Sequence, residues 1–472
     1  MTSREDGLLI DGMMLDEVFE RFAARSPITV MAHLGLERVL DPSWLDEVFE
    51  EYRERQYERE LLFSTVVEVM MLVALGMQPS VHAAVRSRED VRVSLTALYD
   101  KINRTEPALG RAVVRESARR LMAVVEELRA GQPPLCPGYR VRVVDGNCLA
   151  PSEKRLKPLR KVRSAALPGR SLVVYDPDRC LVLDVLPSED GHAGERALMA
   201  ELIATATTGE LWLGDRAFCT YNILSAWRQR GAAFLVREHA ANAKLSACGP
   251  LQEQGKTDSG TVFEQSVDCY GPDGNSIRLR RIELHLNKAT EDGETVIALL
   301  TNLPAEVTAV QVANLYRRRW TIESMFQKIE AILKSEIKTL GYPRAALFSF
   351  CMALLGFNIL SVLQAAVEKQ HRIEPHSPEE LSLYYVANEI KRIHPGMMLI
   401  LPAEYWSSRR VLPHGEYCRL LLRIAAQVNP LALRKSRRGP KTRVKNKPLP
   451  PRLAGAHVST ARLLKKHREG TP

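Results

Sequence analysis

The pattern of hydrophobic and polar positions divides the chain into a helical first part and a body in which strands and helices alternate. Over roughly the first 130 residues, apolar side chains recur at helical spacing. The spacing predicts helices at 44–63, 64–76 and 108–130, and no strand pattern interrupts them. We therefore expect residues 1–132 to form a helical N-terminal domain, suited to DNA binding or equally to packing and dimer formation. The Pro- and Gly-containing stretch 133–138 marks the boundary of this domain.

After this boundary, short apolar runs alternate with helical segments. The order is strand, strand, strand, helix, strand, helix, strand, which is the order of a ribonuclease-H-like α/β fold. In that layout the first strand is central and the fourth lies beside it, so Asp145 and Asp215, which end these strands, are expected to lie close together. The predicted strands are 139–145, 171–176, 180–186, 210–215 and 232–237, and the helices are 193–207 and 219–231.

The remaining pattern completes the domain organisation. A Gly-rich, polar segment with short alternating runs predicts an antiparallel β-rich insertion, after which an apolar strand and helices return. The expected fold class is therefore α/β, with a ribonuclease-H-like core that the insertion interrupts. The predicted divisions are the core at 138–237 and 294–370, the insertion at 238–293, a helical C-terminal region at 371–433 and a basic tail at 434–472.

Positive charge is concentrated in two places. The formal net charge is +10, and the stretch from Arg434 to Arg468 holds 13 Lys or Arg and no Asp or Glu, so the rest of the chain as a whole is not basic. The tail is rich in Pro and poor in apolar residues, which predicts disorder and favours contact with nucleic acid over a merely solubilising role. A second basic cluster lies in the folded body and comprises Lys154, Arg155, Lys157, Arg160, Lys161 and Arg163.

Composition excludes several classes of protein. The eight cysteines lie far apart without a CxxC pair, so neither a zinc site nor a disulfide framework is expected, and a reducing cytoplasm fits best. The acidic N-terminus lacks the pattern of a signal peptide. The uncharged segment 345–367 has the length of a membrane span. Its residues Asn358 and Gln364 favour a buried core helix instead.

A predicted helix at 316–333 carries an unusual polar face beside its apolar stripe. Tyr316, Arg319 and Glu323 stack on this face at offsets of three and four. Taken alone, Arg319 and Glu323 form an ordinary salt bridge, and likewise Asp145 reads as a turn residue and Asp215 as a helix cap. The stripe itself consists of Val312, Leu315, Ile322, Phe326, Ile329 and Leu333.

The predicted fold changes this interpretation because it brings Asp145, Asp215 and Glu323 to one point. Clustered carboxylates repel one another and are favourable mainly when a divalent cation neutralises them. This arrangement fits phosphoryl transfer with two metal ions, for which Mg²⁺ is the expected ion. Arg319 and Tyr316 face the same cleft in this interpretation and hold a DNA phosphate.

These residues resemble the DDE transposases of bacterial insertion sequences, in the IS-four-type branch with a Tyr-x2-Arg-x3-Glu-x6-Lys signature. The match is Tyr316, Arg319 and Glu323 within YRRRWTIE, VVDGN at Asp145 and GDRAF at Asp215, and it covers roughly residues 140–364. The resemblance implies that Asp145, Asp215 and Glu323 are the catalytic, metal-binding triad. It implies Mg²⁺, with Mn²⁺ as a substitute, as the cofactor.

The resemblance also implies the substrate and the partners. Double-stranded DNA is cut at inverted-repeat ends, and the ends are joined to target DNA. The protein is expected to act as a homodimer or higher multimer in the bacterial cytoplasm, associated with the nucleoid, without a membrane. A ribonuclease-H-like nuclease without strand transfer, and a non-catalytic DNA-binding protein derived from a transposase, are the alternatives.

The sequence departs from the family pattern at two points. Glu330 occupies the signature Lys position, and Lys328 and Lys334 are the candidate substitutes, at a different helical phase. The insertion also lacks the tryptophan on which hairpin-forming relatives stack a flipped base, so Phe263 or Tyr270 are the aromatic candidates there.

Three further polar residues are candidates near the site. His192, which precedes a predicted helix, is a candidate neighbour of the metal site. Asp184 and Glu189 lie near a strand end and compete with the chosen carboxylates.

Overall fold

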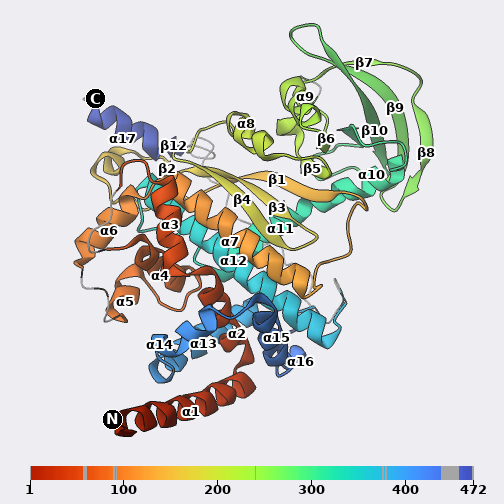
Figure 1. Cartoon of the computed structure of the whole chain (residues 1–472). Helices are drawn as coiled ribbons and strands as arrows, with labels where there is room; N and C mark the ends of the chain where they lie inside the picture. The colour runs from red at the N-terminus through yellow and green to blue at the C-terminus, as the bar shows by residue number, and fades with distance from the viewer. Residues whose placement is uncertain are drawn as a thin grey trace.

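A single mixed sheet forms the centre of the protein. The computed structural model describes residues 2–56, 61–88, 91, 93–239, 241–374, 377, 380–436 and 457–469, with the backbone alone for 2–13. Within these residues the large sheet has the order β4-β3-β1-β5-β6-β11-β10-β9-β7, and β8 pairs with β9 (Figure 1). Its strands are β1 (Arg140–Cys148), β3 (Arg170–Asp176), β4 (Leu181–Ser188), β5 (Glu210–Gly214), β6 (Ala233–Arg237), β7 (Lys244–Ala247), β8 (Gln252–Thr257), β9 (Gly260–Tyr270), β10 (Ser276–Leu286) and β11 (Val296–Thr301).

The first five long strands have the expected arrangement around β1. On one side β1 pairs antiparallel with β3, and β3 continues into β4 through a hairpin. On the other side β1 pairs parallel with β5, and β5 pairs parallel with β6. The predicted neighbourhood of the first and fourth strands of the core is therefore confirmed. Because β1 and β5 are parallel, their carboxyl ends lie at the same edge of the sheet.

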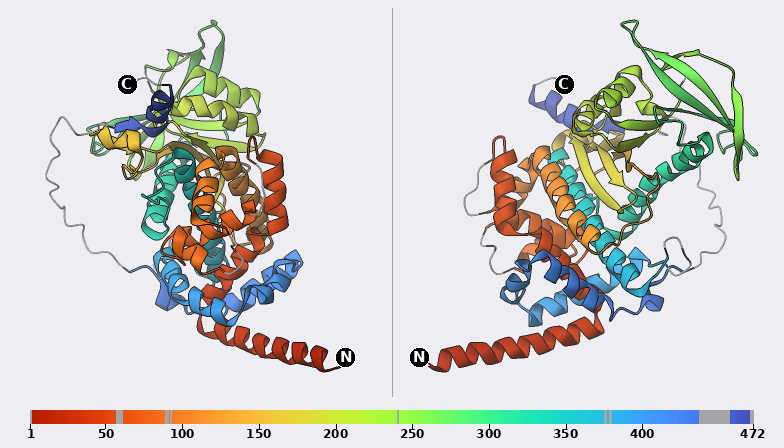
Figure 2. Two further views of the ribbon diagram at one scale, coloured as in Figure 1. Left: turned by 90° about the vertical axis from the view of Figure 1, so that its left-hand side faces the viewer. Right: turned by 45° about the vertical axis from the view of Figure 1, so that its right-hand side comes forward.

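The predicted β-rich insertion is antiparallel, and it extends the central sheet. Strand β10 pairs with β11, and β11 pairs with β6, so the hydrogen-bonded ladder runs without a break from the core into the insertion. The long strands β9 and β10 then project beyond the helices and form a wing at one side of the molecule (Figure 2).

Helices cover both faces of the core sheet. On one face, α8 (Glu195–Thr205) and α9 (Tyr221–Gln229) pack against alternate strand residues such as Val144 and Trp212. On the other face, α7 (Pro107–Glu127) and α12 (Pro343–His371) cover residues such as Val143. Successive strand residues point to opposite faces, which is why these strands read as nearly continuous apolar runs in the sequence.

Helix α12 is the core helix that the apolar segment 345–367 predicted. It is the one helix, in the part of the chain that the structure describes, with the length and apolar composition of a membrane span, and that apolar window is wholly buried inside the protein. Its Asn358 side chain accepts a hydrogen bond from the Val182 N–H at 2.7 Å and donates one to the Val182 carbonyl at 2.8 Å. Since β4 is an edge strand, Asn358 satisfies backbone groups that the sheet leaves unpaired.

The other helices form a shell around α12 and α7. One predicted helix, 44–63, ends earlier than expected, at Tyr52. The buried Glu106 carboxylate accepts hydrogen bonds from the Glu54 and Arg55 N–H groups at 3.0 and 2.9 Å, and these bonds hold the chain extended beyond the helix. The N-terminal helices are α1 (Thr2–Arg25), α2 (Pro27–Val39), α3 (Pro42–Tyr52), α4 (Phe63–Ala74), α5 (Val81–Arg86) and α6 (Leu95–Arg104). The C-terminal helices are α13 (Leu383–Ile400), α14 (Ala403–Arg410), α15 (His414–Ala425) and α16 (Pro430–Leu433).

The end of the predicted disordered tail is folded against the body. Strand β12 (His457–Ser459) pairs in parallel with β2 (Ala165–Leu167), and α17 (Thr460–Arg468) follows it directly. The expectation of disorder is therefore wrong for 457–469, because backbone pairing anchors a segment whose side chains alone offer little apolar surface. The basic stretch 437–456 lies outside the described residues.

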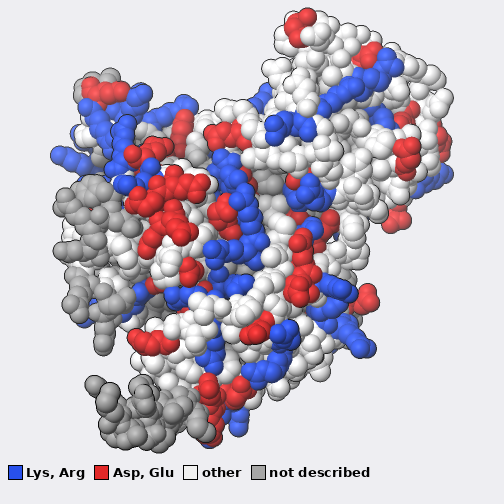
Figure 3. All heavy atoms as spheres, viewed as in Figure 1, with Lys and Arg blue, Asp and Glu red and all other residues white. Residues whose placement is uncertain are grey.

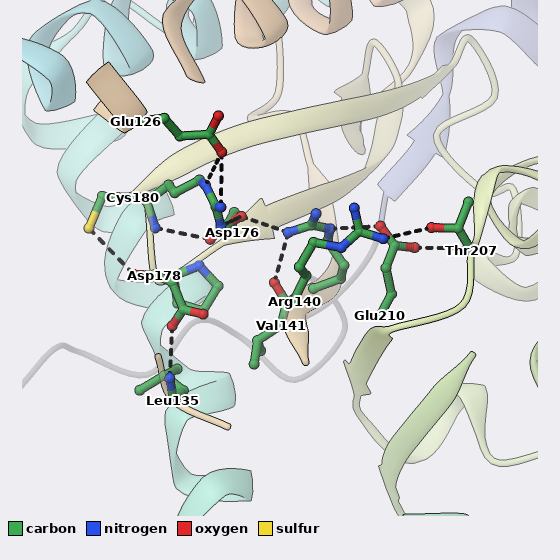
Figure 4. A network of polar contacts seen from close by, with 12 residues as sticks. Glu126, Leu135, Arg140, Val141, Asp176, Asp178, Cys180, Thr207 and Glu210 are labelled. Carbon is green, nitrogen blue, oxygen red and sulfur yellow. Dashed lines mark hydrogen bonds and ion pairs between the residues drawn. The ribbon is translucent and has the colours of Figure 1, made fainter. Parts of the chain in front are cut away.

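A buried ion network ties the strands together at the start of β1 and β5 (Figure 4). Arg142 donates to Asp176 at 2.6 Å and to Glu210 at 3.2 Å, and Arg179 pairs with Asp176 and Glu126. The Asp176 side chain is fully buried, so its charge depends on both arginines for compensation. This network lies toward the opposite ends of β1 and β5 from Asp145 and Asp215.

Candidate active site

Two of the three predicted acids lie on or directly after neighbouring strands. The sequence pattern predicted that the first strand ends at Asp145, but β1 continues to Cys148 because residues 145–148 stay paired with β3. The Asp145 Oδ1 accepts the Gly146 N–H at 2.9 Å. Asp215 directly follows β5 and caps the short 3₁₀ helix η2 (Arg216–Phe218), where its Oδ1 accepts the Ala217 N–H at 2.7 Å. Each carboxylate thus accepts a hydrogen bond from a backbone N–H one or two residues further along the chain, which fixes its orientation.

The third acid comes from the helix with the polar face. This segment is α10 (Ala309–Tyr316), one 3₁₀ turn η3 (Arg317–Arg319) and α11 (Trp320–Ile332), and its predicted apolar stripe is buried apart from the half-buried Phe326. Helix α10 starts with a capping box between Thr308 and Gln311. The buried stripe fixes the rotation of the helix, and this rotation turns Arg319 and Glu323 toward β1.

Arg319 joins the helix to the strand. Its guanidinium donates to Asp145 Oδ2 at 3.0 Å and to Glu323 Oε1 at 2.8 Å. The ordinary intrahelical salt bridge is therefore present, but the same side chain also bridges to a residue 174 positions away in the sequence. The Arg319 side chain is 9% exposed, so this is a desolvated contact and not a surface pair. Arg319 thus brings the first and third predicted acids to one cation.

Burial controls the protonation of Asp145. Burial raises the pKa of Asp145 to about 6, although the neighbouring Arg319 charge acts to lower it. The nearby Asp215 and Glu195 charges raise the pKa further. Asp145 and Asp215 therefore interact electrostatically, as their neighbouring strands predicted. A carboxyl group with a strongly shifted pKa is typical of a functional site.

A fourth carboxylate, Glu195, belongs to the same cluster and was missed in the sequence. It is the first residue of α8, and it pairs with Arg170 at 2.7 Å. Burial raises the pKa of Glu195, Arg170 lowers it, and Asp215 raises it. The Glu195 carboxylate also lies directly over Gly146, where a Cβ atom would collide with it. The feature of the sequence that could have pointed to Glu195 was Gly146, the glycine after Asp145, but it was interpreted as a turn residue.

The donor set fits a divalent cation by its chemistry. Asp145, Asp215 and Glu323 offer carboxylate oxygens, which are the ligands that Mg²⁺ prefers. Arg319 contacts two of them at once, so the Asp145 and Glu323 carboxylates both lie within hydrogen-bonding distance of one guanidinium group. Among the described residues, however, no three His, Cys, Asp or Glu side chains already converge closely enough to hold a metal ion. Asp145 and Glu323 thus share Arg319 as a partner, whereas Asp215 interacts with Asp145 through their charges, and metal binding by the three acids stays a prediction.

Tyr316 and Arg319 are both buried, and Arg319 contacts the acids. Burial raises the pKa of Tyr316 to about 12, with opposing influence from Arg319. Because Arg319 is engaged by two carboxylates here, its predicted contact with a DNA phosphate requires that it exchange partners. The adjacent Trp320 is 59% exposed, and the Arg319 guanidinium lies 5.1 Å from the centre of its ring.

The basic cluster at 153–163 is largely exposed and surrounds the short helix η1 (Lys157–Lys161). Lys154 donates to the Val162 carbonyl, Arg155 pairs with Glu153, and Arg160 donates to the Arg155 carbonyl. For the exposed Lys157, Lys161 and Arg163, no ion pair is found among the described residues.

Two of the further candidates, His192 and Lys334, have other partners. His192 Nε2 lies 2.7 Å from His457 Nδ1, so it contacts the C-terminal segment instead of a carboxylate. Lys334 donates to the Pro79 carbonyl at 2.7 Å, which makes it a packing residue against the N-terminal helices. Lys328 is half-buried, and Glu330 at the signature Lys position is exposed.

The structure also shows the partners of the two competing carboxylates and the surroundings of the two aromatic residues of the insertion. Asp184 is held by Arg111 at 2.8 Å, and Glu189 is held by Arg344 at 2.8 Å, so both serve structural ion pairs. The Phe263 ring packs against His285, and Tyr270 is exposed on the wing.

The fold and the site together define an α/β protein in which interacting carboxylates lie on one parallel strand and directly after its neighbour. Comparison with known proteins supports this class. Residues 138–356 match the sequence model of a family described as "Transposase DDE domain", and this region contains Asp145, Asp215 and Glu323. The matched region begins where the sequence pattern predicted the start of the core.

One curated relative matches as well. The protein called "Putative transposase y4zB" from Sinorhizobium fredii is 28% identical over 198 residues, which cover 40% of this chain and 52% of the relative. The chain thus spans about half the length of the relative that it matches. Together, the family match and this relative support a DDE transposase.

Proposed function

We propose that this protein is a metal-dependent DNA transposase that cuts DNA at inverted-repeat ends and joins the freed 3′ hydroxyl ends to target DNA. The observation that carries the proposal is the Arg319 bridge between Asp145 and Glu323. It connects the polar face of α11 to β1, beside β5, which Asp215 directly follows. The strand order β4-β3-β1-β5-β6 supports a ribonuclease-H-like core, and the Tyr316, Arg319 and Glu323 spacing supports the Tyr-Arg-Glu-Lys branch.

Asp145, Asp215 and Glu323 would hold Mg²⁺, with Mn²⁺ as a substitute, and the bound ions supply activation of the attacking oxygen and stabilisation of the leaving oxygen. The chain itself fixes these carboxylates: the Gly146 and Ala217 N–H groups orient the two aspartates, and the buried stripe of α11 orients Glu323. Arg319 neutralises Asp145 and Glu323 in the free protein. In the active complex, Arg319 and Tyr316 turn to the phosphate of the DNA end, where a planar guanidinium can donate two hydrogen bonds.

Exposed cations on a neighbouring segment favour an anionic partner. The cations around η1 lie on the segment that follows β1, the strand that carries Asp145. Phosphate contacts of this kind position the duplex without reading its sequence. The recognition of particular ends, action as a homodimer or higher multimer, and location in the bacterial cytoplasm are parts of the same proposal.

The test uses purified protein and a supercoiled plasmid that carries the DNA flanking the gene on both sides of a marker. Wild type with Mg²⁺ is expected to release the marker fragment and to form joined products with a second plasmid. Glu323→Gln, which keeps the size of the side chain, is expected to bind the plasmid and leave it uncut. Cleavage without joined products would favour a nuclease that lacks strand transfer, and equal cleavage by Glu323→Gln would remove this residue from the triad.

A further inference from the structure

The two basic segments that are distant in the sequence lie together in the structure. Helix α17 packs against η1, and β12 pairs with β2, which follows η1 in the chain. Figure 3 shows Lys and Arg side chains gathered at the corner of the molecule where α17 lies. We call this surface the basic platform, and its exposed cations are Arg155, Lys157, Arg160, Lys161, Arg163, Arg462, Lys465, Lys466 and Arg468.

We propose that the basic platform is one binding surface for the phosphate backbone of duplex DNA, and that the C-terminal segment completes this surface by docking. The inference rests on the proposed function, because it assigns the DNA partner of the transposase to a particular surface. It differs from the expectation of a free basic tail, since it requires α17 to be held beside η1.

The docking is specific in its contacts. Backbone pairing joins His457, Val458 and Ser459 to Ala165, Ala166 and Leu167. The Ser459 hydroxyl accepts the Gly191 N–H at 3.1 Å, and Arg462 pairs with Asp190 at 2.7 Å. The buried Ser459 and Thr460 are the residues at which α17 begins. These contacts hold α17 at a fixed place on the body.

The charge of the basic platform fits a polyanion. Glu153, Asp190 and Glu469 pair with Arg155, Arg462 and Lys465, respectively. Within the described ranges, no ion pair is found for Lys157, Lys161, Arg163, Lys466 or Arg468. Exposed cations without acidic partners displace the counterions that are condensed on DNA phosphates, and this release drives DNA binding.

The position of the basic platform relative to the acids supports DNA as the partner. The contacts of β12 go to Gly191 and His192, in the loop that leads into α8 and Glu195. On its other side, the Glu153 N–H donates to the Lys338 carbonyl at 3.0 Å, in the segment that follows α11. The basic platform therefore adjoins the loop before α8 and the segment after α11, and these two helices carry Glu195 and Glu323 of the acidic cluster.

The first experiment measures binding of a linear duplex of unrelated sequence to the full chain by fluorescence anisotropy over a range of salt concentrations. Replacing Lys465, Lys466 and Arg468 together by Gln is expected to reduce the slope of log affinity against log salt by about 2 to 3, since each phosphate contact contributes about 0.9. The matched control replaces Lys369, Arg392 and Arg419 by Gln, removes the same charge from exposed sites elsewhere, and is expected to retain most of the slope.

A second variant separates a docked surface from a free tail. Val458→Pro keeps every charge but removes a strand N–H of β12, and it is expected to reduce the slope as the charge variant does. A thermal melting curve checks that its body remains folded. An unchanged slope in Val458→Pro would show that the basic residues bind as a free tail, and an unchanged slope in the charge variant would overturn the basic platform altogether. If the wild type bound no duplex and cut no plasmid, the proposed function itself would fail.

Discussion

Replacing Asp145 by Asn is expected to stabilise the fold while it removes the chemistry. The pKa of this buried carboxyl group is raised from 3.8 to about 6, mainly by burial, with Arg319 opposing the shift. One pKa unit corresponds to about 1.4 kcal/mol, so keeping Asp145 ionised at pH 8 costs the native state about 3 kcal/mol. Asn has nearly the same shape and no charge, so it relieves much of this cost.

The raised pKa of Asp145 also determines how the free energy of unfolding changes with pH. Between the unfolded and folded pKa values the native state binds more protons, so the wild type loses stability as pH rises from about 4 to about 6, and the full cost remains above that range. Asp145→Asn is thus expected to raise the free energy of unfolding by up to about 3 kcal/mol at pH 8 and by about half as much at pH 5.

The assay is urea unfolding of both proteins in EDTA at these two pH values. The control is Asp176→Asn, which breaks the buried network around Arg142 and is expected to lose about 3 to 5 kcal/mol. A lower free energy of unfolding for Asp145→Asn at pH 8 would refute the reasoning. It would mean that the ion pair with Arg319 outweighs the burial of the charge.

Three other variants test separate parts of the account. Glu195→Gln is expected to slow metal-dependent cleavage by about 10- to 100-fold and to weaken Mn²⁺ binding measured by titration calorimetry, as outer residues of metal sites do; unchanged values would make Glu195 a purely structural partner of Arg170. Arg319→Gln is expected to bind Mn²⁺ more tightly at pH 8 without DNA, since no guanidinium competes, yet to cleave DNA more slowly; weaker Mn²⁺ binding would contradict the bridge. Asn358→Leu leaves two backbone groups of Val182 unpaired and is expected to lower the free energy of unfolding by about 2 to 4 kcal/mol in the same urea assay; an unchanged value would show that water replaces the amide.

The sequence predicted the parts of the fold that local patterns control. Apolar runs ending at Asp145 and Asp215 located the two strands, and their order predicted that they pair. The stripe on α11 predicted which residues are buried, and its neighbouring face located Arg319 and Glu323. These predictions hold because periodicity decides which side of an element meets the core.

Long-range contacts were the parts that the sequence did not reveal. Glu195 looks like an ordinary acid at the start of a helix, and only its position over Gly146 connects it to Asp145. Strand β12 is three residues long within a basic, Pro-rich stretch, so composition indicated disorder, whereas pairing with β2 decides its structure. Arg319 similarly looked like half of an intrahelical pair, because its contact with Asp145 spans most of the core.

The most direct test of the central claim is excision and reinsertion of a marked cassette, bounded by the DNA that flanks this gene, in bacterial cells. Cells that express the wild type are expected to lose the cassette from its donor site and to carry it at new positions, and cells that express Asp215→Asn or Glu323→Gln at equal levels are expected to do neither. Excision by either variant at the wild-type frequency would contradict the assignment of these carboxylates and the mechanism that depends on them.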